Sequence, residues 1–368
     1  MDVESVCKSC LFISVKRRTK MEQLVRTVIP AGRHIVSQEL NDLVNKIPSY
    51  LAGTVAVSTG GIYYNTFIRF KNFCIDNGVP FLPSEPKVIM AYLIKVSENS
   101  ESVSPALAAR SAIRHYNLLH LPNLPSPTDA TDVAMMIKSI ERKFSAPVKK
   151  RECTTPQIVR KFVDLLCNDQ MNNSFSKPVE DWFLVAKTIV KFHCFARFEE
   201  VIVLKWDNFT ILSSGNIEVT FLKAKNNQFH DARKSLIAKN NEEPQYCPVN
   251  LIYKYFHVLG RPALTAFFLP KIVCKQKVLL DQPASYHYCS KQFKAALVRI
   301  GMNPIGYGEH SDRIGGLSAA AAVGCSISDL QSQGRWKSDY APKLYLKKSK
   351  EKRSQVSKVL NSLKSVTY

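Results

Sequence analysis

A short stretch between residues 145 and 153 divides the sequence into two parts with different patterns. It reads Ser145-Ala-Pro-Val-Lys-Lys-Arg-Glu152, so a proline is soon followed by three consecutive cations. Such a stretch can bury little apolar surface and is typical of an exposed linker. A chain of 368 residues is long enough for two hydrophobic cores. We therefore predict a linker at 147–153, with one domain at 48–146 and another at 154–350.

The part before this linker has helical periodicity and no strand pattern. Tyr63, Phe67, Phe70 and Cys74 are spaced by four, three and four residues, which places them on one face of a helix. Similar apolar spacings begin after residues 84, 104 and 128. The sequence thus predicts a compact all-α domain, preceded at 1–47 by a flexible basic arm.

The part after the linker mixes both periods. Ile217–Phe221 alternates like a strand, and residues 235–238 can return beside it as the second strand of a hairpin. Helical patterns flank this hairpin. One predicts an apolar helix that follows Arg197 and ends at Trp206-Asp207. From 247 onward the pattern is helical again and includes a helix that begins at Ser290. The predicted fold class is mainly α with a small antiparallel β-hairpin or sheet. Residues 351–368 predict an amphipathic helix, which either covers its own domain or docks on a neighbouring subunit.

The balance of charge favours a polyanionic partner. The formal net charge is +21 and the isoelectric point is about 9.5. Nucleic acid is the first candidate for such a basic protein. The linker cations Lys149, Lys150 and Arg151 are candidates for contacts along a phosphate backbone.

Other classes of protein find little support. No apolar run reaches the ~18 residues that a membrane span needs, and no signal-peptide pattern opens the chain. The ten cysteines form no disulfide framework, which is typical of reduced thiols in an intracellular protein. Cys7 and Cys10 form a single C-x-x-C pair without a second pair at zinc-like spacing, so we predict no metal site.

Residues suited to catalysis on a phosphate group gather near the C-terminus. His310 and Arg313 lie three positions apart, so a helix would project both side chains from one face. The motif Gly334-Arg335-Trp336 follows, and Tyr345 comes nine residues after Trp336. An arginine fork can hold phosphate oxygens at two points. A tyrosine with an ordinary pKa near 10 becomes a good nucleophile where cations stabilise its oxyanion.

This order of residues resembles the C-terminal signature of the tyrosine recombinases, the phage-integrase-like enzymes. The Gly-Arg-Trp-Lys-Ser form is most similar to eukaryotic mobile-element recombinases of the DIRS and Crypton type, and it replaces the Leu-Gly-His of many members. The resemblance implies a helical, SAM-like core-binding domain joined by a linker to an α+β catalytic domain, the two of them clamping a DNA duplex.

The resemblance also implies a role for each site residue. Arg197 and Arg313 would clamp the scissile phosphate, and Glu200 would orient Arg197. Lys225 would protonate the leaving oxygen, with Lys223 as the competing candidate in the same hairpin. His310 would assist proton transfer, and Trp336 would donate to a phosphate oxygen. Tyr345 would be the nucleophile; Tyr340 is its rival, but it is only four residues from Trp336.

The implied reaction breaks and rejoins DNA strands through a 3′-phosphotyrosyl intermediate, without metal, ATP or another cofactor. In keeping with this, the sequence has no carboxylate cluster for magnesium and no Gly-Lys-Ser/Thr loop for ATP. The expected protein is a site-specific recombinase or integrase of a mobile element, assembling as a tetramer on DNA, in the nucleus if the source is eukaryotic. Two alternatives stay open: a domesticated, catalytically silent DNA-binding protein, and a type IB topoisomerase-like enzyme.

Overall fold

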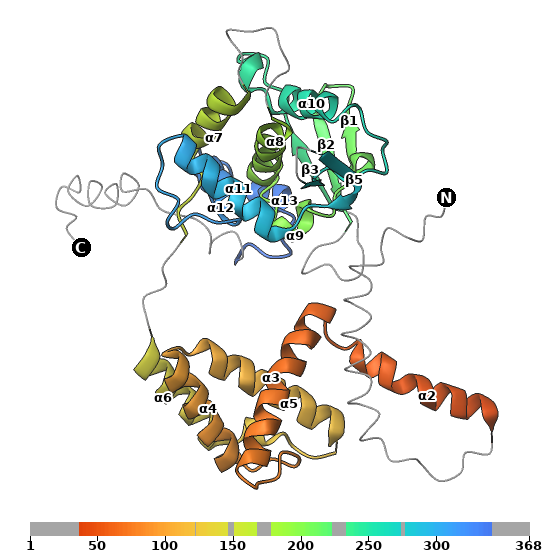
Figure 1. Ribbon diagram of the computed structural model, residues 1–368, viewed down its shortest axis with the longest axis vertical. Helices are drawn as coiled ribbons and strands as arrows, with labels where there is room; N and C mark the ends of the chain where they lie inside the picture. Colours follow the sequence, from red (N-terminus) through yellow and green to blue (C-terminus); the bar gives the residue numbers. More distant parts are fainter. Residues whose placement is uncertain are drawn as a thin grey trace, which may run out of the picture. The chain divides into compact units, whose positions relative to one another are not determined.

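The structure is a computed structural model that describes residues 37–121, 123–145, 151–167, 178–222, 233–273 and 277–340. The chain divides into two compact units, Met1–Val148 and Lys149–Tyr368 (Figure 1). The division lies inside the stretch that the sequence predicts to be the linker.

The described part of the first unit is entirely helical. Its elements are α2 (Gln38–Ala52), α3 (Val57–Asp76), α4 (Pro86–Ser100), α5 (Ser104–His120), the short 3-10 helix η2 (Pro127–Asp129) and α6 (Thr131–Phe144). The apolar faces of α3 to α6 meet in one core, in which Phe67 stacks on Tyr116 with ring centroids 4.1 Å apart. The periodic residues that predicted these helices are therefore the residues that pack them together.

Helix α2 departs from the prediction, because it includes residues 38–47 of the expected flexible arm. Ser37 caps its first turn by accepting a hydrogen bond from the Leu40 amide. Leu40, Leu43 and Ile47 are spaced by three and four residues, as on one face of a helix, but all three are exposed.

The second unit combines helices with two small antiparallel sheets. Its helical elements are α7 (Pro156–Phe162), the π-helix η3 (Val163–Cys167), α8 (Val179–His193), α9 (Phe198–Val201), η4 (Trp206–Asn208), η5 (Pro244–Tyr246), α10 (Pro248–Val258), α11 (Tyr286–Arg299), α12 (Ser311–Ala322) and α13 (Ile327–Gln333). Its strands are β1 (Phe209–Ile211), β2 (Ile217–Phe221), β3 (Arg233–Ile237), β4 (Pro270–Val273) and β5 (Lys277–Pro283). The strand orders are β1-β2-β3 and β4-β5, and the predicted hairpin is β2-β3 with Val219 opposite Ser235.

Helix α8 is the centre of the second unit. Every residue from Asp181 to Lys191 is buried, and α7, α10, α11 and α12 all pack against this helix (Figure 1). A helix that is buried on all sides needs apolar residues all round, and most of α8 satisfies this. Two lysines in it, Lys187 and Lys191, are exceptions that require buried partners.

The mainly helical fold with small antiparallel sheets agrees with the predicted class, but three details differ. The β4-β5 hairpin lies in a region that the sequence predicted to be helical. Helix α11 begins at Tyr286, capped by Ser285, instead of at Ser290. The apolar helix expected to reach Trp206 ends at Val201, because the chain turns there to pair with 264–268: the Trp206 amide donates to Ala266 O at 3.1 Å.

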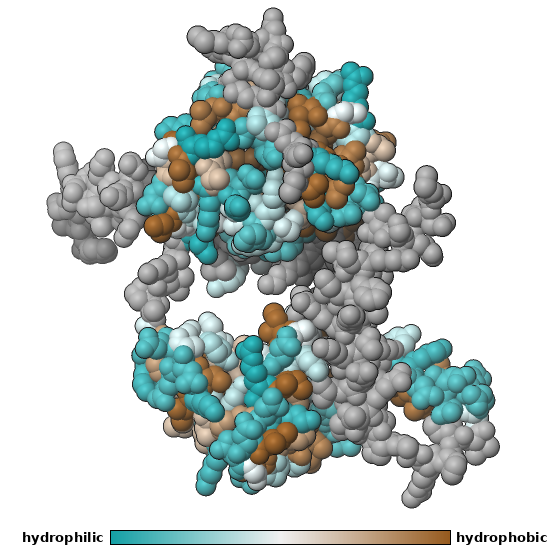
Figure 2. All heavy atoms as spheres, in the orientation of Figure 1, coloured by the Kyte–Doolittle hydropathy of each residue, from teal (hydrophilic) through white to brown (hydrophobic). Residues whose placement is uncertain are grey.

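The visible face of both units carries mainly hydrophilic residues, with apolar residues in scattered patches (Figure 2). Among the described residues, no helix combines the length and apolar character that crossing a bilayer requires.

Candidate active site

Two helix starts bring the first candidate residues together. Arg197 is the N-cap of α9, and His310 is the N-cap of α12, with Arg313 in the first turn of α12. Arg197 and Glu200 form a capping box, in which the Glu200 carboxylate accepts from the Arg197 amide at 2.9 Å. The same carboxylate accepts from the Arg197 guanidinium at 2.8 Å, so Glu200 fixes both ends of this arginine.

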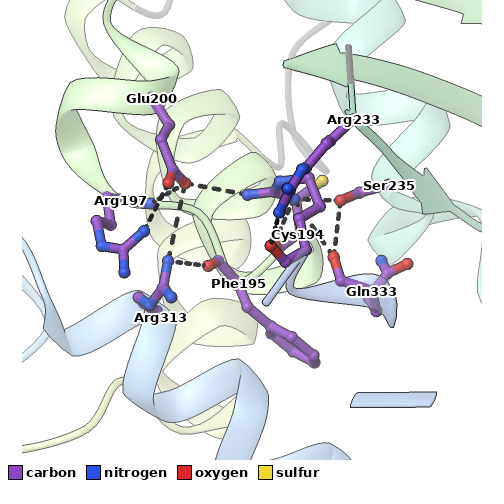
Figure 3. A network of polar contacts seen from close by, with 9 residues as sticks. Cys194, Phe195, Arg197, Glu200, Arg233, Ser235, Arg313 and Gln333 are labelled. Atoms are coloured by element: carbon purple, nitrogen blue, oxygen red, sulfur yellow. Dashed lines mark hydrogen bonds and ion pairs between the residues drawn. The ribbon is translucent and has the colours of Figure 1, made fainter. Parts of the chain in front are cut away.

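Glu200 also joins arginines from two other segments (Figure 3). Its Oε2 atom lies 3.0 Å from Nη2 of Arg335 and 3.7 Å from Nη1 of Arg313. Burial would raise the pKa of Glu200, but Arg335, the Arg197 amide and Arg313 lower it below its usual value. Glu200 is therefore an anion at the centre of three cations.

Arg313 is held from several sides. Its Nη1 atom donates to the carbonyl oxygen of Phe195 at 2.7 Å, and its guanidinium lies 4.7 Å from the ring centre of Trp336. Trp336 is buried, including its indole nitrogen, and stacks on Phe195. Arg313 itself is fully buried, so contact with a ligand requires the atoms that cover it to move.

His310 lies at the rim of this cluster, where its side chain is accessible. Desolvation by neighbouring atoms lowers its pKa, and the cations Lys191, Arg313 and Arg197 lower it further, while Glu199 acts in the opposite direction. Such a histidine is neutral near pH 7, which is the form that can accept a proton.

Behind His310 and Arg313 lies a fully buried set of charges, which we call the buried ion cluster: Lys187, Lys191, Glu309 and Asp312. Glu309 accepts from Lys187 at 2.8 Å and from Lys191 at 2.6 Å, and Lys191 reaches Asp312 at 3.1 Å. The two lysines come from α8, and the two carboxylates immediately precede His310 and Arg313. The cluster thus connects the central helix to both of these candidate residues.

Two glycines allow this close approach of α12. A Cβ atom at Gly315 would lie 1.8 Å from Thr154 O, and one at Gly316 would lie 1.9 Å from Phe192 O. No larger residue fits at either position without moving the backbone. The small-residue run after Arg313 is therefore required by packing of α12 against α8 and the chain before α7.

The residue that the sequence interpretation missed is Arg335, which had been treated only as part of a motif. Its Nη1 atom donates to the carbonyl oxygen of Cys194 at 2.9 Å and to the Ser235 hydroxyl, and its guanidinium lies 3.7 Å from the centre of the Phe221 ring. Burial lowers the pKa of Arg335, while Glu200 raises it. Arg335 lies between Gly334 and Trp336 in the sequence, and neither residue indicates these contacts.

Several predicted residues lie outside the described residues: Lys149, Lys150, Lys223, Lys225 and Tyr345. The strands β2 and β3 that flank the two candidate lysines are described, and Ser235 on β3 bonds to Gln333 O at 2.7 Å. Of the linker cations, Arg151 is described and exposed. The rival nucleophile Tyr340 is 66% exposed.

The described cluster is suited to binding an anion with several oxygens. Arg197 and Arg313 present two guanidiniums that share one carboxylate, and His310 is beside them. Fixed cations of this kind stabilise negative charge that develops during a reaction. Among the residues that the structure describes, no group of His, Cys, Asp or Glu could hold a metal ion.

Comparisons with known proteins support the same fold. No family model matches the sequence, and no curated protein matches it either. Among solved structures, the XerH site-specific recombinase bound to a palindromic difH substrate aligns over 95% of this chain and 96% of its own, with a TM-score of 0.56 at 11% identity.

Two integrases align similarly. Lambda integrase bound to a COC′ core site gives a TM-score of 0.53 at 15% identity, covering 85% of this chain and 96% of its own. The Tn1549 transposon integrase bound to transposon right-end DNA gives 0.50 at 12% identity, covering 93% and 99%. At such low identities these likenesses show that the chain has the fold of tyrosine recombinases.

Proposed function

We propose that this protein is a site-specific tyrosine recombinase or integrase, which cuts and rejoins DNA strands of a mobile element. The observation that carries the proposal is the meeting of Arg197 and Arg313 on one buried carboxylate, Glu200, with His310 beside them. These residues come from separate segments of the chain, so their convergence is a property of the fold. The fold of DNA-bound recombinases supports the same assignment.

In the proposed reaction, the Tyr345 oxygen attacks the scissile phosphorus and its proton passes to a base, for which His310 is the candidate. A P–O bond to the 5′ oxygen breaks as the phosphotyrosyl bond forms, and Lys225 gives the leaving oxygen its proton. Arg197 and Arg313 hold the non-bridging oxygens, on which negative charge increases. The ester preserves the bond energy, so a 5′ hydroxyl of another strand can reverse the steps and rejoin the DNA.

Further parts of the proposal concern the assembly and the setting. Exchange of strands between two duplexes requires four active sites, so we expect a tetramer on double-stranded DNA. Lys149, Lys150 and Arg151 are the proposed backbone contacts of the linker. We expect the protein to act in the nucleus if its source is eukaryotic, and with the DNA of the cytoplasm otherwise.

Tyr345→Phe tests the reaction. The substrate is a nicked duplex carrying the repeats that flank the gene, and the readout is a protein–DNA band that survives denaturant. We expect the wild-type protein to give this band and Tyr345→Phe to give none, because phenylalanine has no nucleophilic oxygen. Duplex affinity should stay within about twofold, since the substitution leaves the phosphate-binding cations in place.

Tyr340→Phe is the matched control, because it removes the same atom from an exposed tyrosine nearby and should leave the band unchanged. A band that persists in Tyr345→Phe and disappears in Tyr340→Phe would move the nucleophile to residue 340. Relaxation of supercoiled DNA without any joining of two duplexes would instead indicate a topoisomerase.

A further inference from the structure

The backbone at residue 335 has a conformation that arginine rarely adopts. Its φ angle is +59°, in the left-handed region where glycine is favoured. A non-glycine residue in this region persists only where surrounding contacts hold it there. The Arg335 side chain makes such contacts with several elements, and it is 5% exposed.

These contacts join three parts of the second unit: α9, β3 and the chain that follows α8. The guanidinium bonds to Glu200 on α9, to Ser235 on β3 and to the Cys194 carbonyl after α8. The Arg335 carbonyl accepts in turn from Arg233 on β3 at 2.8 Å. Arg335 thus links strand β3 to α9 and to the chain that follows α8.

The charges suggest a more specific role than support. Glu200 is 3% exposed, so its carboxylate must be neutralised by nearby cations. If only Arg197 and Arg313 were available, they would be bound more tightly to Glu200 and would be weaker ligands for a phosphate. Arg335 is the third cation, and it contacts Glu200 at a shorter distance than Arg313 does, 3.0 Å against 3.7 Å.

We propose that Arg335 is a positioning residue that neutralises Glu200, and thereby leaves Arg197 and Arg313 able to bind the scissile phosphate. This proposal rests on the proposed function, in which those two arginines are the phosphate ligands. It predicts that the loss of Arg335 can be compensated by removing the negative charge of Glu200, because the competing anion then disappears.

The test compares Arg335→Gln, Arg335→Lys and the double variant Arg335→Gln/Glu200→Gln, with Arg299→Gln as control. The control breaks the pair of Arg299 with the buried Asp181, which lies at the opposite end of α8. The first readout is the rate of covalent DNA attachment under single-turnover conditions. The second readout is the midpoint of thermal unfolding followed by tryptophan fluorescence, which reports this unit because Trp182, Trp206 and Trp336 are the three tryptophans of the chain.

We expect Arg335→Gln to slow attachment by roughly 10- to 100-fold, as is found when an outer partner that orients a metal ligand is lost. Arg335→Lys should recover part of the rate, because it keeps the positive charge. The double variant should be at least about tenfold faster than Arg335→Gln, and Arg299→Gln should match the wild-type protein. A double variant as slow as Arg335→Gln, or a folded Arg335→Lys as slow as Arg335→Gln, would overturn the proposal.

The unfolding midpoint separates this proposal from the proposed function. If the wild-type protein forms no covalent adduct, the recombinase assignment fails. The unfolding midpoints of the variants still show whether Arg335 neutralises Glu200. A double variant that melts above Arg335→Gln supports neutralisation of Glu200. A double variant that melts at the same temperature or below contradicts it. Removing the negative charge of Glu200 would then give no gain in stability when Arg335 is absent.

Discussion

The two units of this protein differ in what their interiors contain. In the first unit, the described residues bury only uncharged polar side chains, since burial lowers the pKa of the one histidine among them: Ser84, Ser97, Asn117, His120, Ser126 and Thr128. In the second unit, the described residues bury acids and bases as well: Asp181, Lys187, Lys191, Glu200, Glu309, Asp312 and Arg313. Both units have a continuous apolar core, so the difference is one of electrostatics.

The difference indicates where the second unit buries charged groups that hold other side chains in place, at a cost in stability. Removing an ion from water costs several kcal/mol, and a buried ion pair recovers this only with good partners. Apart from Asp181, the buried charges of the second unit lie where α8, α9 and α12 meet, around His310 and Arg313. The first unit has no such junction among its described residues, and an apolar core is sufficient to hold its helices.

The largest expected effect is at Glu309. Glu309→Gln removes the negative charge between the buried Lys187 and Lys191 and replaces one of its two accepting oxygens with an amide nitrogen, so it should reduce the free energy of unfolding of the second unit by about 3–5 kcal/mol. Chemical denaturation followed by tryptophan fluorescence measures this.

Glu98→Gln is the matched control in the first unit. It breaks the exposed pair with Lys143 and should cost less than about 1 kcal/mol, measured by hydrogen exchange of α4 and α6. Equal costs at the two positions would show that the burial of charge does not distinguish the units.

A smaller effect is expected from pH. The two lysines hold the pKa of Glu309 at about 2 against its desolvation, while an unfolded glutamate has a pKa of about 4.3. A lowered acid pKa gives stability that is complete above about 4.3 and is lost as the pH falls through about 2. The difference in unfolding free energy between wild type and Glu309→Gln should therefore be constant from pH 8 to 5 and should shrink from pH 4 downwards. A difference that shrinks already between pH 7 and 5 would contradict this.

The smallest effect is expected at Tyr116 in the first unit. Its hydroxyl is buried without a hydrogen-bond partner among the described residues, and its ring stacks on Phe67. Tyr116→Phe keeps the ring and removes a poorly solvated oxygen, so stability should change by less than about 1 kcal/mol or increase. Hydrogen exchange of α3 and α5 measures it. A loss above about 2 kcal/mol would show that the first unit also depends on buried polar contacts.

The same contrast explains what the sequence could predict. The helices of the first unit follow from apolar spacing alone, as at Phe67 and Phe70, because their core is apolar. In the second unit the β2-β3 hairpin followed from strict alternation, whereas the β4-β5 hairpin was missed because its polar and apolar residues do not alternate clearly. Helix α9 ends at Val201, before the predicted Trp206, because residues 264–268 pair with the chain after it. No local sequence pattern predicts this pairing.

The candidate site was predictable in part. A motif can propose Arg197, His310 and Arg313, but it says nothing about Glu309 or Arg335, whose roles depend on long-range contacts. One signal was present: Lys187 and Lys191 lie four residues apart in an otherwise apolar helix, and such a pair demands buried acids. The catalytic roles of Arg197, Lys225, His310, Arg313, Trp336 and Tyr345 all remain predictions, and Tyr345→Phe tests the last of them.

The left-handed backbone at Arg335 has an evolutionary consequence. Glycine would suit the main chain at this position, but it has no side chain to reach Glu200 and Ser235. Other long side chains would meet the same backbone penalty and lack the planar fork. Few substitutions are therefore neutral there, so residue 335 should change more slowly than the exposed residues 337–340 in any lineage that keeps the enzyme working.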